Sequence, residues 1–218
     1  MTVPLSPPQA TTTANVLGLI PGRDPELAQE LVILSAHYDH VGRSADGTLY
    51  PGADDDASGV GVLLEVARLW QEAGVRPRRS VLFAAWGAEE FGQLGSAYYL
   101  THPLRPLAET VGLLHLDGVG AGSGFFLTVE GDLTREALLR AHLESAADQL
   151  GGRVDFVTAT EVSDQTPFQA QGVPAMLLTW KGSADDANHP GDTSEGVDPL
   201  KLGKTGRIVA LALRTLAE

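Results

Sequence analysis

The chain has 218 residues, a formal net charge of −13, 43% hydrophobic residues and no cysteine. This length is most simply one globular domain with enough residues to bury a core. The negative charge argues against nucleic acids and anionic membranes as partners, because both are negatively charged themselves. The lack of cysteine excludes disulfides, thiolate nucleophiles and cysteine-based zinc sites.

The first 13 residues are rich in proline and threonine and predict an extended arm. They contain neither a basic region nor an apolar run, so they do not form a signal peptide. No apolar run reaches the ~20 residues that a transmembrane helix needs. The chain as given therefore predicts a cytoplasmic protein, or a secreted one if a leader has been trimmed. We interpret residues 14–218 as a single domain, since no linker or repeat divides them.

Apolar strands alternate with amphipathic helices along the chain. Three continuous apolar runs are typical of strands buried on both faces. Such an alternation predicts a three-layer α/β/α sandwich around a mixed, largely parallel central sheet. The expected strands are 14–20, 30–36, 80–86, 111–116, 125–130, 154–157 and 175–180, and the expected helices are 57–73, 94–100, 133–149, 166–171 and 199–216.

Three consecutive aspartates, residues 54–56, lie between two glycines at the start of the expected helix 57–73. Adjacent carboxylates repel one another unless a cation lies among them. A simpler interpretation is helix capping, because Asp56 or Ser58 suits the positive end of a helix. This stretch by itself leaves capping and metal binding equally open.

Polar side chains follow three of the apolar strands at the point where each strand ends. In open α/β sheets, ligands bind beyond the carboxyl ends of the strands. Singly, each residue also fits a buried histidine, a helix start or a turn. Together they require a cation, because buried carboxylates without partners cost several kcal/mol and no Lys or Arg stands beside them. These residues are His37, Asp39, Glu89, Glu90 and Asp117.

The motifs resemble those of the M28 family of metallopeptidases, the dizinc aminopeptidases of the bacterial leucyl-aminopeptidase type. They are residues 37–39, 52–59, 88–90 and 116–117, followed by His189 ahead of 192–193. They occur in the family's order, and the resemblance extends from about residue 14 to the C-terminus. It implies the zinc-dependent exopeptidase fold and an aminopeptidase that acts on peptides with a free N-terminus.

The resemblance also implies two zinc ions per chain, for which cobalt or manganese are possible substitutes. In the family one carboxylate bridges the two ions, and each ion has two further protein ligands. The family also implies a cis peptide bond between the bridging aspartate and the residue after it. Carried over to this chain, Asp54 is the bridge with the cis bond to Asp55, His37 and Asp117 hold one ion, and Glu90 and His189 hold the other.

Four further residues have expected roles beside the metals. The resemblance makes Glu89 the general base, and it makes Asp39 a hydrogen-bond partner that fixes the tautomer of His37. Phe168 and Trp180 are candidate walls of a pocket for an apolar substrate side chain.

The sequence departs from the family pattern near its end. Asn188 stands where the family usually has a tyrosine, and the spacing from His189 to Asp192 is one residue short. An ungapped match would place Asn188 at the ligand position, but we expect His189 there because imidazole binds zinc far better than a carboxamide. Gln165 replaces a histidine that often follows Ser-Asp in the family. We expect His40 to support a ligand rather than to bind metal.

Other functions remain open at this point. A related zinc amide hydrolase of the carboxypeptidase or deacylase kind would use the same residues, and so would a single-zinc transferase resembling glutaminyl cyclases. A scaffold that has lost its metals and serves as a binding module is supported only by Asn188 and Gln165. The sequence does not indicate the oligomeric state or the preferred substrate residue.

Overall fold

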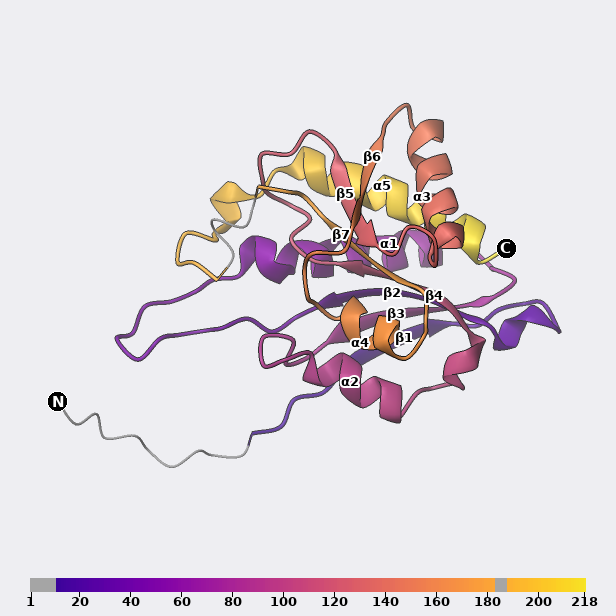
Figure 1. Ribbon diagram of the computed structural model, residues 1–218, viewed down its shortest axis with the longest axis horizontal. Coiled ribbons are helices and arrows are strands. Elements are labelled where there is room, and N and C mark those ends of the chain that lie inside the picture. Colours follow the sequence, from indigo (N-terminus) through magenta and orange to yellow (C-terminus); the bar gives the residue numbers. More distant parts are fainter. Residues whose placement is uncertain (1–10, 183–187) are drawn as a thin grey trace.

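The computed structural model describes residues 11–182 and 188–218, and its centre is one mixed β-sheet (Figure 1). The strand order across the sheet is β1-β3-β2-β4-β7-β5-β6. The strands are β1 (Val16–Ile20), β2 (Leu31–His37), β3 (Ser80–Trp86), β4 (Thr110–Leu116), β5 (Leu127–Gly131), β6 (Val154–Thr158) and β7 (Ala175–Thr179).

The four central strands, β3, β2, β4 and β7, all run in the same direction. At one edge β1 pairs antiparallel with β3, and at the other β5 pairs antiparallel with β7 and parallel with β6. The expectation of a mixed, largely parallel sheet is confirmed. The carboxyl ends of β2, β3 and β4 therefore meet at one edge of the sheet, where the polar residues that follow them come together.

Helices cover both faces of the sheet, so the molecule has three layers (Figure 1). Val32 and Leu34 of β2 pack into one apolar core, and Leu31 and Ile33 of the same strand pack into the other. This explains why β2 is a continuous apolar run rather than an alternating one. On one face lie α1 (Gly59–Glu72), α3 (Ala137–Gln149) and α5 (Pro199–Leu216), and on the other lie α2 (Leu94–Thr101) and α4 (Gln165–Ala170).

The expected elements are all present, and most of their ends agree within two residues. Helix α3 begins at Ala137 rather than at residue 133, because the Asp132 carboxylate accepts the N–H groups of Thr134 and Arg135 and forms a turn there. Most of the expected arm, residues 1–10, lies outside the described residues. In the described part of the chain, no helix is long and apolar enough to span a membrane.

Helix α2 packs directly on the segment that leads from β3 to the expected catalytic acids. A Cβ atom on Gly95 would lie 2.3 Å from the carbonyl oxygen of Gly87 and 2.8 Å from its nitrogen. The side chain of Asn15 joins the two, since it donates to the carbonyl of Gly95 and accepts from the N–H of Gly87. This close contact positions the chain just ahead of Glu89.

We predict that Gly95→Ala lowers the free energy of unfolding by about 1–3 kcal/mol, because the added methyl group meets backbone that cannot move freely. Gly61→Ala is the matched control, since Gly61 also lies in a helix but has no atom within 4 Å of the added Cβ. That control should gain about 0.5–1 kcal/mol. Urea denaturation measures both values, and equal effects would contradict the proposed close packing.

Candidate metal centre

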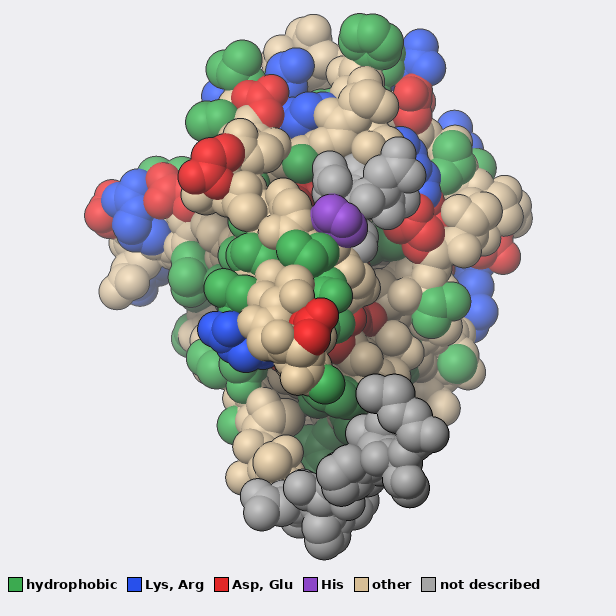
Figure 2. All heavy atoms as spheres, turned by 90° about the vertical axis from the view of Figure 1, so that its left-hand side faces the viewer, with side chains coloured by type: hydrophobic (Ala, Val, Ile, Leu, Met, Phe, Trp, Pro, Cys, Tyr) green, Lys and Arg blue, Asp and Glu red, His purple; other side chains and the backbone are tan. Residues whose placement is uncertain are grey.

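A cavity of about 460 Å³ opens at the carboxyl ends of the central strands. Figure 2 looks onto this face and shows acidic side chains within a recess. Among the described residues that line the cavity, the one basic residue is Lys181, and its ammonium group is paired with Glu130 and Glu161. The cavity is therefore strongly negative. In the described part of the chain, its acidic lining residues are Asp54, Asp55, Glu89, Glu90, Asp117, Glu161 and Asp192.

His37, the last residue of β2, presents one ring nitrogen to two carboxylates. Its Nδ1 lies 3.0 Å from the backbone carbonyl oxygen of Asp39. A carbonyl only accepts, so Nδ1 carries a hydrogen, and in the neutral ring Nε2 holds the free lone pair. Nε2 lies 3.1 Å from Oδ1 of Asp55 and 3.7 Å from Oδ1 of Asp117, and it has no hydrogen bond within the described residues.

The charge around this imidazole has a clear effect on its protonation. Burial opposes a charge on His37, but the carboxylates of Asp117, Asp39 and Asp55 outweigh burial and raise the pKa of the ring. The surroundings of the ring thus favour a positive charge at this position. A bound cation would satisfy the same field.

A second group of ligand-type atoms lies on the other side of Asp55. His40 Nδ1 is 2.7 Å from Oε1 of Glu90 and 3.9 Å from Oδ2 of Asp55. Asp55 therefore turns one carboxylate oxygen toward His37 and the other toward His40. Within the described chain, the groups able to hold a metal ion are His37–Asp55–Asp117 and His40–Asp55–Glu90, with Asp55 in both.

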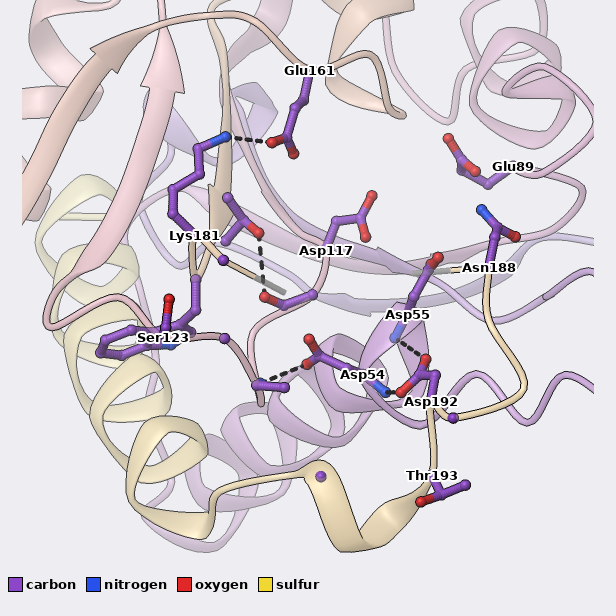
Figure 3. A pocket seen from close by; sticks show the side chains of 18 of the residues that line it. Asp54, Asp55, Glu89, Asp117, Ser123, Glu161, Lys181, Asn188, Asp192 and Thr193 are labelled. Atoms are coloured by element: carbon purple, nitrogen blue, oxygen red, sulfur yellow. Dashed lines mark hydrogen bonds and ion pairs between the residues drawn. The ribbon is translucent and has the colours of Figure 1, made fainter. Parts of the chain in front are cut away.

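The structure places Asp55, rather than the expected Asp54, between the two histidines. Oδ1 of Asp54 accepts the N–H groups of Gly120 at 2.6 Å and Ala121 at 2.9 Å, which fixes the loop after β4 (Figure 3). The cis peptide bond joins Asp55 to Asp56, so the expected bond between Asp54 and Asp55 was wrong. Three adjacent aspartates look equivalent in sequence, and only the backbone path decides which one lies between His37 and His40.

Asp192 and Asp56 hold the acidic turn, residues 54–56, in place. Asp192 accepts the N–H of Asp54 at 2.7 Å with one oxygen and the N–H of Asp55 at 3.0 Å with the other. Asp56 accepts the N–H of Gly59 at the start of α1 and the N–H of His37. The capping interpretation is thus confirmed for Asp56, and it coexists with a metal group built on its neighbour.

Asp39 positions the two glutamates rather than the imidazole. Its carboxylate accepts the N–H of Glu89 at 2.9 Å and the N–H of Glu90 at 3.3 Å. Its Oδ1 is 3.8 Å from Nδ1 of His37, while its backbone carbonyl receives the hydrogen bond from that ring. The tautomer of His37 is therefore set by the main chain of Asp39, which is a correction of the expected side-chain contact.

Glu89 lines the cavity but belongs to neither ligand group (Figure 3). Its side chain is largely buried, and Gln93 donates to Oε1 at 2.9 Å. Burial raises the pKa of Glu89 above the usual range for a glutamate. A carboxylate that is close to the metal groups yet free of them, with an increased affinity for a proton, suits general-base chemistry.

The loop after β7 places Asn188, not His189, beside Glu90. The carboxamide of Asn188 lies 3.2 Å from both oxygens of Glu90, where its nitrogen can donate to either. His189 is exposed, and its Nδ1 accepts the N–H of Gly191. The expected ligand role of His189 does not agree with this geometry. Because Asp192 is hydrogen-bonded to the acidic turn, Asn188, four positions before it, is the residue that lies beside Glu90.

Comparison with known proteins agrees with this site. Residues 15–213 match the model of peptidase family M28. The chain belongs to this family.

Aminopeptidase YwaD of Bacillus subtilis (strain 168) is 28% identical over 93% of the chain and 44% of its own length. The solved structure of an aminopeptidase from Aneurinibacillus sp. strain AM-1 has a TM-score of 0.80 at 28% identity, covering 94% of the chain and 48% of that structure. A zinc aminopeptidase from Bacillus subtilis has a TM-score of 0.80 at 27% identity, covering 94% and 50%. This M28 chain spans about half the length of these relatives.

The two aromatic residues expected in a substrate pocket lie mainly in the core of the M28 fold. Phe168 is fully buried and packs against Trp86 and Tyr99 with ring centroids about 6 Å away, so it does not reach the cavity. Trp180 contributes to the cavity wall but is only 2% exposed, and its indole N–H donates to Thr205. The role expected for Phe168 was therefore wrong.

A buried polar chain behind Asp117 escaped the sequence reasoning. The hydroxyl of Ser163 donates to Oδ2 of Asp117 at 2.7 Å, and the ring of His115 links that hydroxyl to Ser35 on β2. Burial lowers the pKa of His115 to about 3, so its ring is neutral. Gln165 takes no part, since it donates to the carbonyl of Glu161. The sequence signal for this polar chain was the presence of Ser35 and His115 within otherwise apolar strands.

Asp164 provides a prediction on pH. It is fully buried, Ser96 donates to one of its oxygens, and burial raises its pKa from 3.8 to about 7. Between these values the unfolded chain releases the proton while the folded chain keeps it. Asp164 thus lowers stability as the pH rises from about 4 to 7, by up to about 4 kcal/mol.

Asp164→Asn should remove this loss, because an amide does not ionise and still accepts from Ser96. We expect the variant to gain stability relative to the parent chain as the pH rises from 5 to 8, measured by urea denaturation. Asp148→Asn, at an exposed position on α3, should show no such gain. An equal pH dependence in the parent and Asp164→Asn would contradict the assignment.

Proposed function

We propose that residues 14–218 form the catalytic domain of a metal-dependent aminopeptidase, which hydrolyses the N-terminal residue from peptides. The observation that carries the proposal is the Asp55 carboxylate, whose two oxygens face two different imidazoles. This is the arrangement that two metal ions sharing one carboxylate require. The aminopeptidases among the relatives support the same activity.

The residues fit zinc in type and spacing. Histidine and carboxylates are the usual ligands of catalytic zinc, and tetrahedral bonds of ~2.0–2.1 Å place ligand atoms about 3.3 Å apart. The two distances from Nε2 of His37, 3.1 Å to Asp55 and 3.7 Å to Asp117, bracket that spacing. Nε2 is buried and has no hydrogen bond among the described residues, as expected of a ligand atom.

Under this proposal one ion binds to His37, Asp55 and Asp117, and the other binds next to Asp55 and Glu90. Three ligand carboxylates nearly balance the charge of two divalent ions, which allows the site to remain largely shielded from water. Zinc is supported by the zinc aminopeptidase among the similar structures. Cobalt or manganese would tolerate the same ligand types.

The bound metals would supply Lewis-acid activation of the scissile carbonyl and of a water molecule. Glu89 would accept a proton from the attacking water and return it to the leaving amine. Asp39 would hold Glu89 in position through the backbone hydrogen bond. The excess of carboxylates in the cavity would attract the positively charged α-amino group of a peptide substrate.

We predict that the protein releases p-nitroaniline from aminoacyl-p-nitroanilides and leaves N-acyl amino acids intact. The reverse preference would favour a deacylase or carboxypeptidase-like hydrolase instead. Glu89→Gln should lower kcat by at least ~10²-fold, because the amide cannot accept the proton. Its zinc content should stay the same, and Glu144→Gln, an exposed change on α3, should leave both values unchanged.

Asp55→Asn and Asp54→Asn form a matched pair for the shared ligand. We predict that Asp55→Asn no longer holds two zinc ions after dialysis against zinc, because the amide cannot bridge them. Asp54→Asn should keep its zinc, although the loss of charge at the Gly120 and Ala121 amides lowers stability by about 1–3 kcal/mol. Elemental analysis decides the outcome, and loss of zinc from Asp54→Asn alone would restore Asp54 as the bridge.

A further inference from the structure

We infer that His40 supplies the imidazole ligand of the second metal ion, in place of a histidine from the loop after β7. The inference rests on the proposed two-metal function and concerns one ligand of that site. It assigns a metal-binding role to the loop after β2. The side chain of His40 belongs to the second group of ligand-type atoms, with Asp55 and Glu90, and not to the group of His37.

The surroundings of His40 are those of a ligand rather than of a hydrogen-bonded core histidine. The side chain is 10% exposed, and neither ring nitrogen has a hydrogen bond within the described residues. Nδ1 lies 2.7 Å from Oε1 of Glu90, yet no hydrogen bond joins the two atoms. Two ring nitrogens without hydrogen bonds, in a largely buried side chain beside the carboxylates of Glu90 and Asp55, favour a cation among them.

The backbone is shaped to admit this ring. A Cβ atom on Gly52 would lie 2.7 Å from Cγ of His40 and 2.9 Å from its Cβ, and the φ angle of Gly52 is +70°. Only glycine combines that angle with the space the ring needs. Between His40 and Gly52 the chain folds back on itself, with a β-bridge between Arg43 and Leu49. This fold brings the residues that follow the loop next to His40.

The loop after β7 does not provide the missing imidazole. Asp192 is fixed by its bonds to the N–H groups of Asp54 and Asp55, and this anchor brings Asn188 to Glu90. His189 is exposed and bonded to Gly191. A carboxamide is a poor zinc ligand, so the second group draws its nitrogen from the opposite side of Asp55.

The test is a zinc titration of the metal-free full-length chain by isothermal calorimetry, with no activity measurement. We expect two ions to bind to the parent chain and to His189→Ala. In His40→Ala the first ion should bind with affinity within about threefold of the parent. The second should bind at least ~10–100-fold more weakly, as for the loss of a residue that controls a metal site.

A second variant keeps the test decisive if His40→Ala does not fold. His40→Asn retains a polar side chain of smaller volume and should lose the second ion in the same way, with a circular dichroism spectrum like that of the parent. The double variant His40→Ala/Asn188→His should regain the second ion, because position 188 lies against Glu90. Recovery there would also show that Glu90 and Asp55 remain in place.

Failure of the inference differs from failure of the proposed function. If His40→Ala and His40→Asn keep both ions while His189→Ala loses one, the assignment to His40 is overturned and the two-metal site stands. If the parent chain binds fewer than two zinc ions, the two-metal proposal itself is overturned, and the assignment falls with it.

Discussion

The mutual repulsion of carboxylates at the carboxyl edge of the sheet is the constraint on which the rest of the site depends. Asp55, Glu90 and Asp117 converge there from three separate segments, and no arginine or lysine among the described residues lining the cavity is paired with them. Such a concentration of negative charge is unfavourable in a partly buried cavity unless positive charge enters it. The histidines next to these carboxylates offer nitrogen atoms that could bind a divalent ion.

The fold resolves this repulsion by dividing the acidic residues into two kinds. Asp39, Asp54, Asp56 and Asp192 each accept backbone N–H groups, so their carboxylates have hydrogen-bond partners without any ion. The remaining carboxylates point inward, where the ligand atoms of the two histidines also lie. Hydrogen bonds from the main chain therefore occupy the first kind and leave the second kind for the proposed metal ions. The same bonds hold the backbone of Asp55 and Glu90, whose N–H groups are donors to Asp192 and Asp39.

The group of His40, Asp55 and Glu90 suggests how a metal site could take its histidine from a different loop. With Asn188 against Glu90, an imidazole on the neighbouring β2 loop faces the same pair of carboxylates. The shared Asp55 makes this possible, because its two oxygens open toward both sides. In the proposed site, a carboxylate shared in this way would hold two ions while different segments of the chain could complete the ligands of each.

Much of this protein follows from its sequence. Apolar runs of strand length, separated by amphipathic helices, determine an α/β/α sandwich, because only buried strands tolerate apolar residues on both faces. Polar residues at the ends of those runs determine where the site lies, since parallel strands bring their carboxyl ends together. His37, Glu89, Glu90 and Asp117, which the sequence placed at this edge, do lie together there.

Sequence spacing did not predict which residue reaches the site where several residues of a similar kind lie close together in the chain. The choice between Asp54 and Asp55 depends on the backbone of the acidic turn, which Asp192 holds from 137 residues away in the chain. The choice between Asn188, His189 and His40 depends on the same anchor and on the room left at Gly52. The sequence by itself determined the layers, the edge that carries the site and the residue types in it. Only the tertiary structure decided which aspartate and which histidine face inward, because long-range hydrogen bonds set those directions.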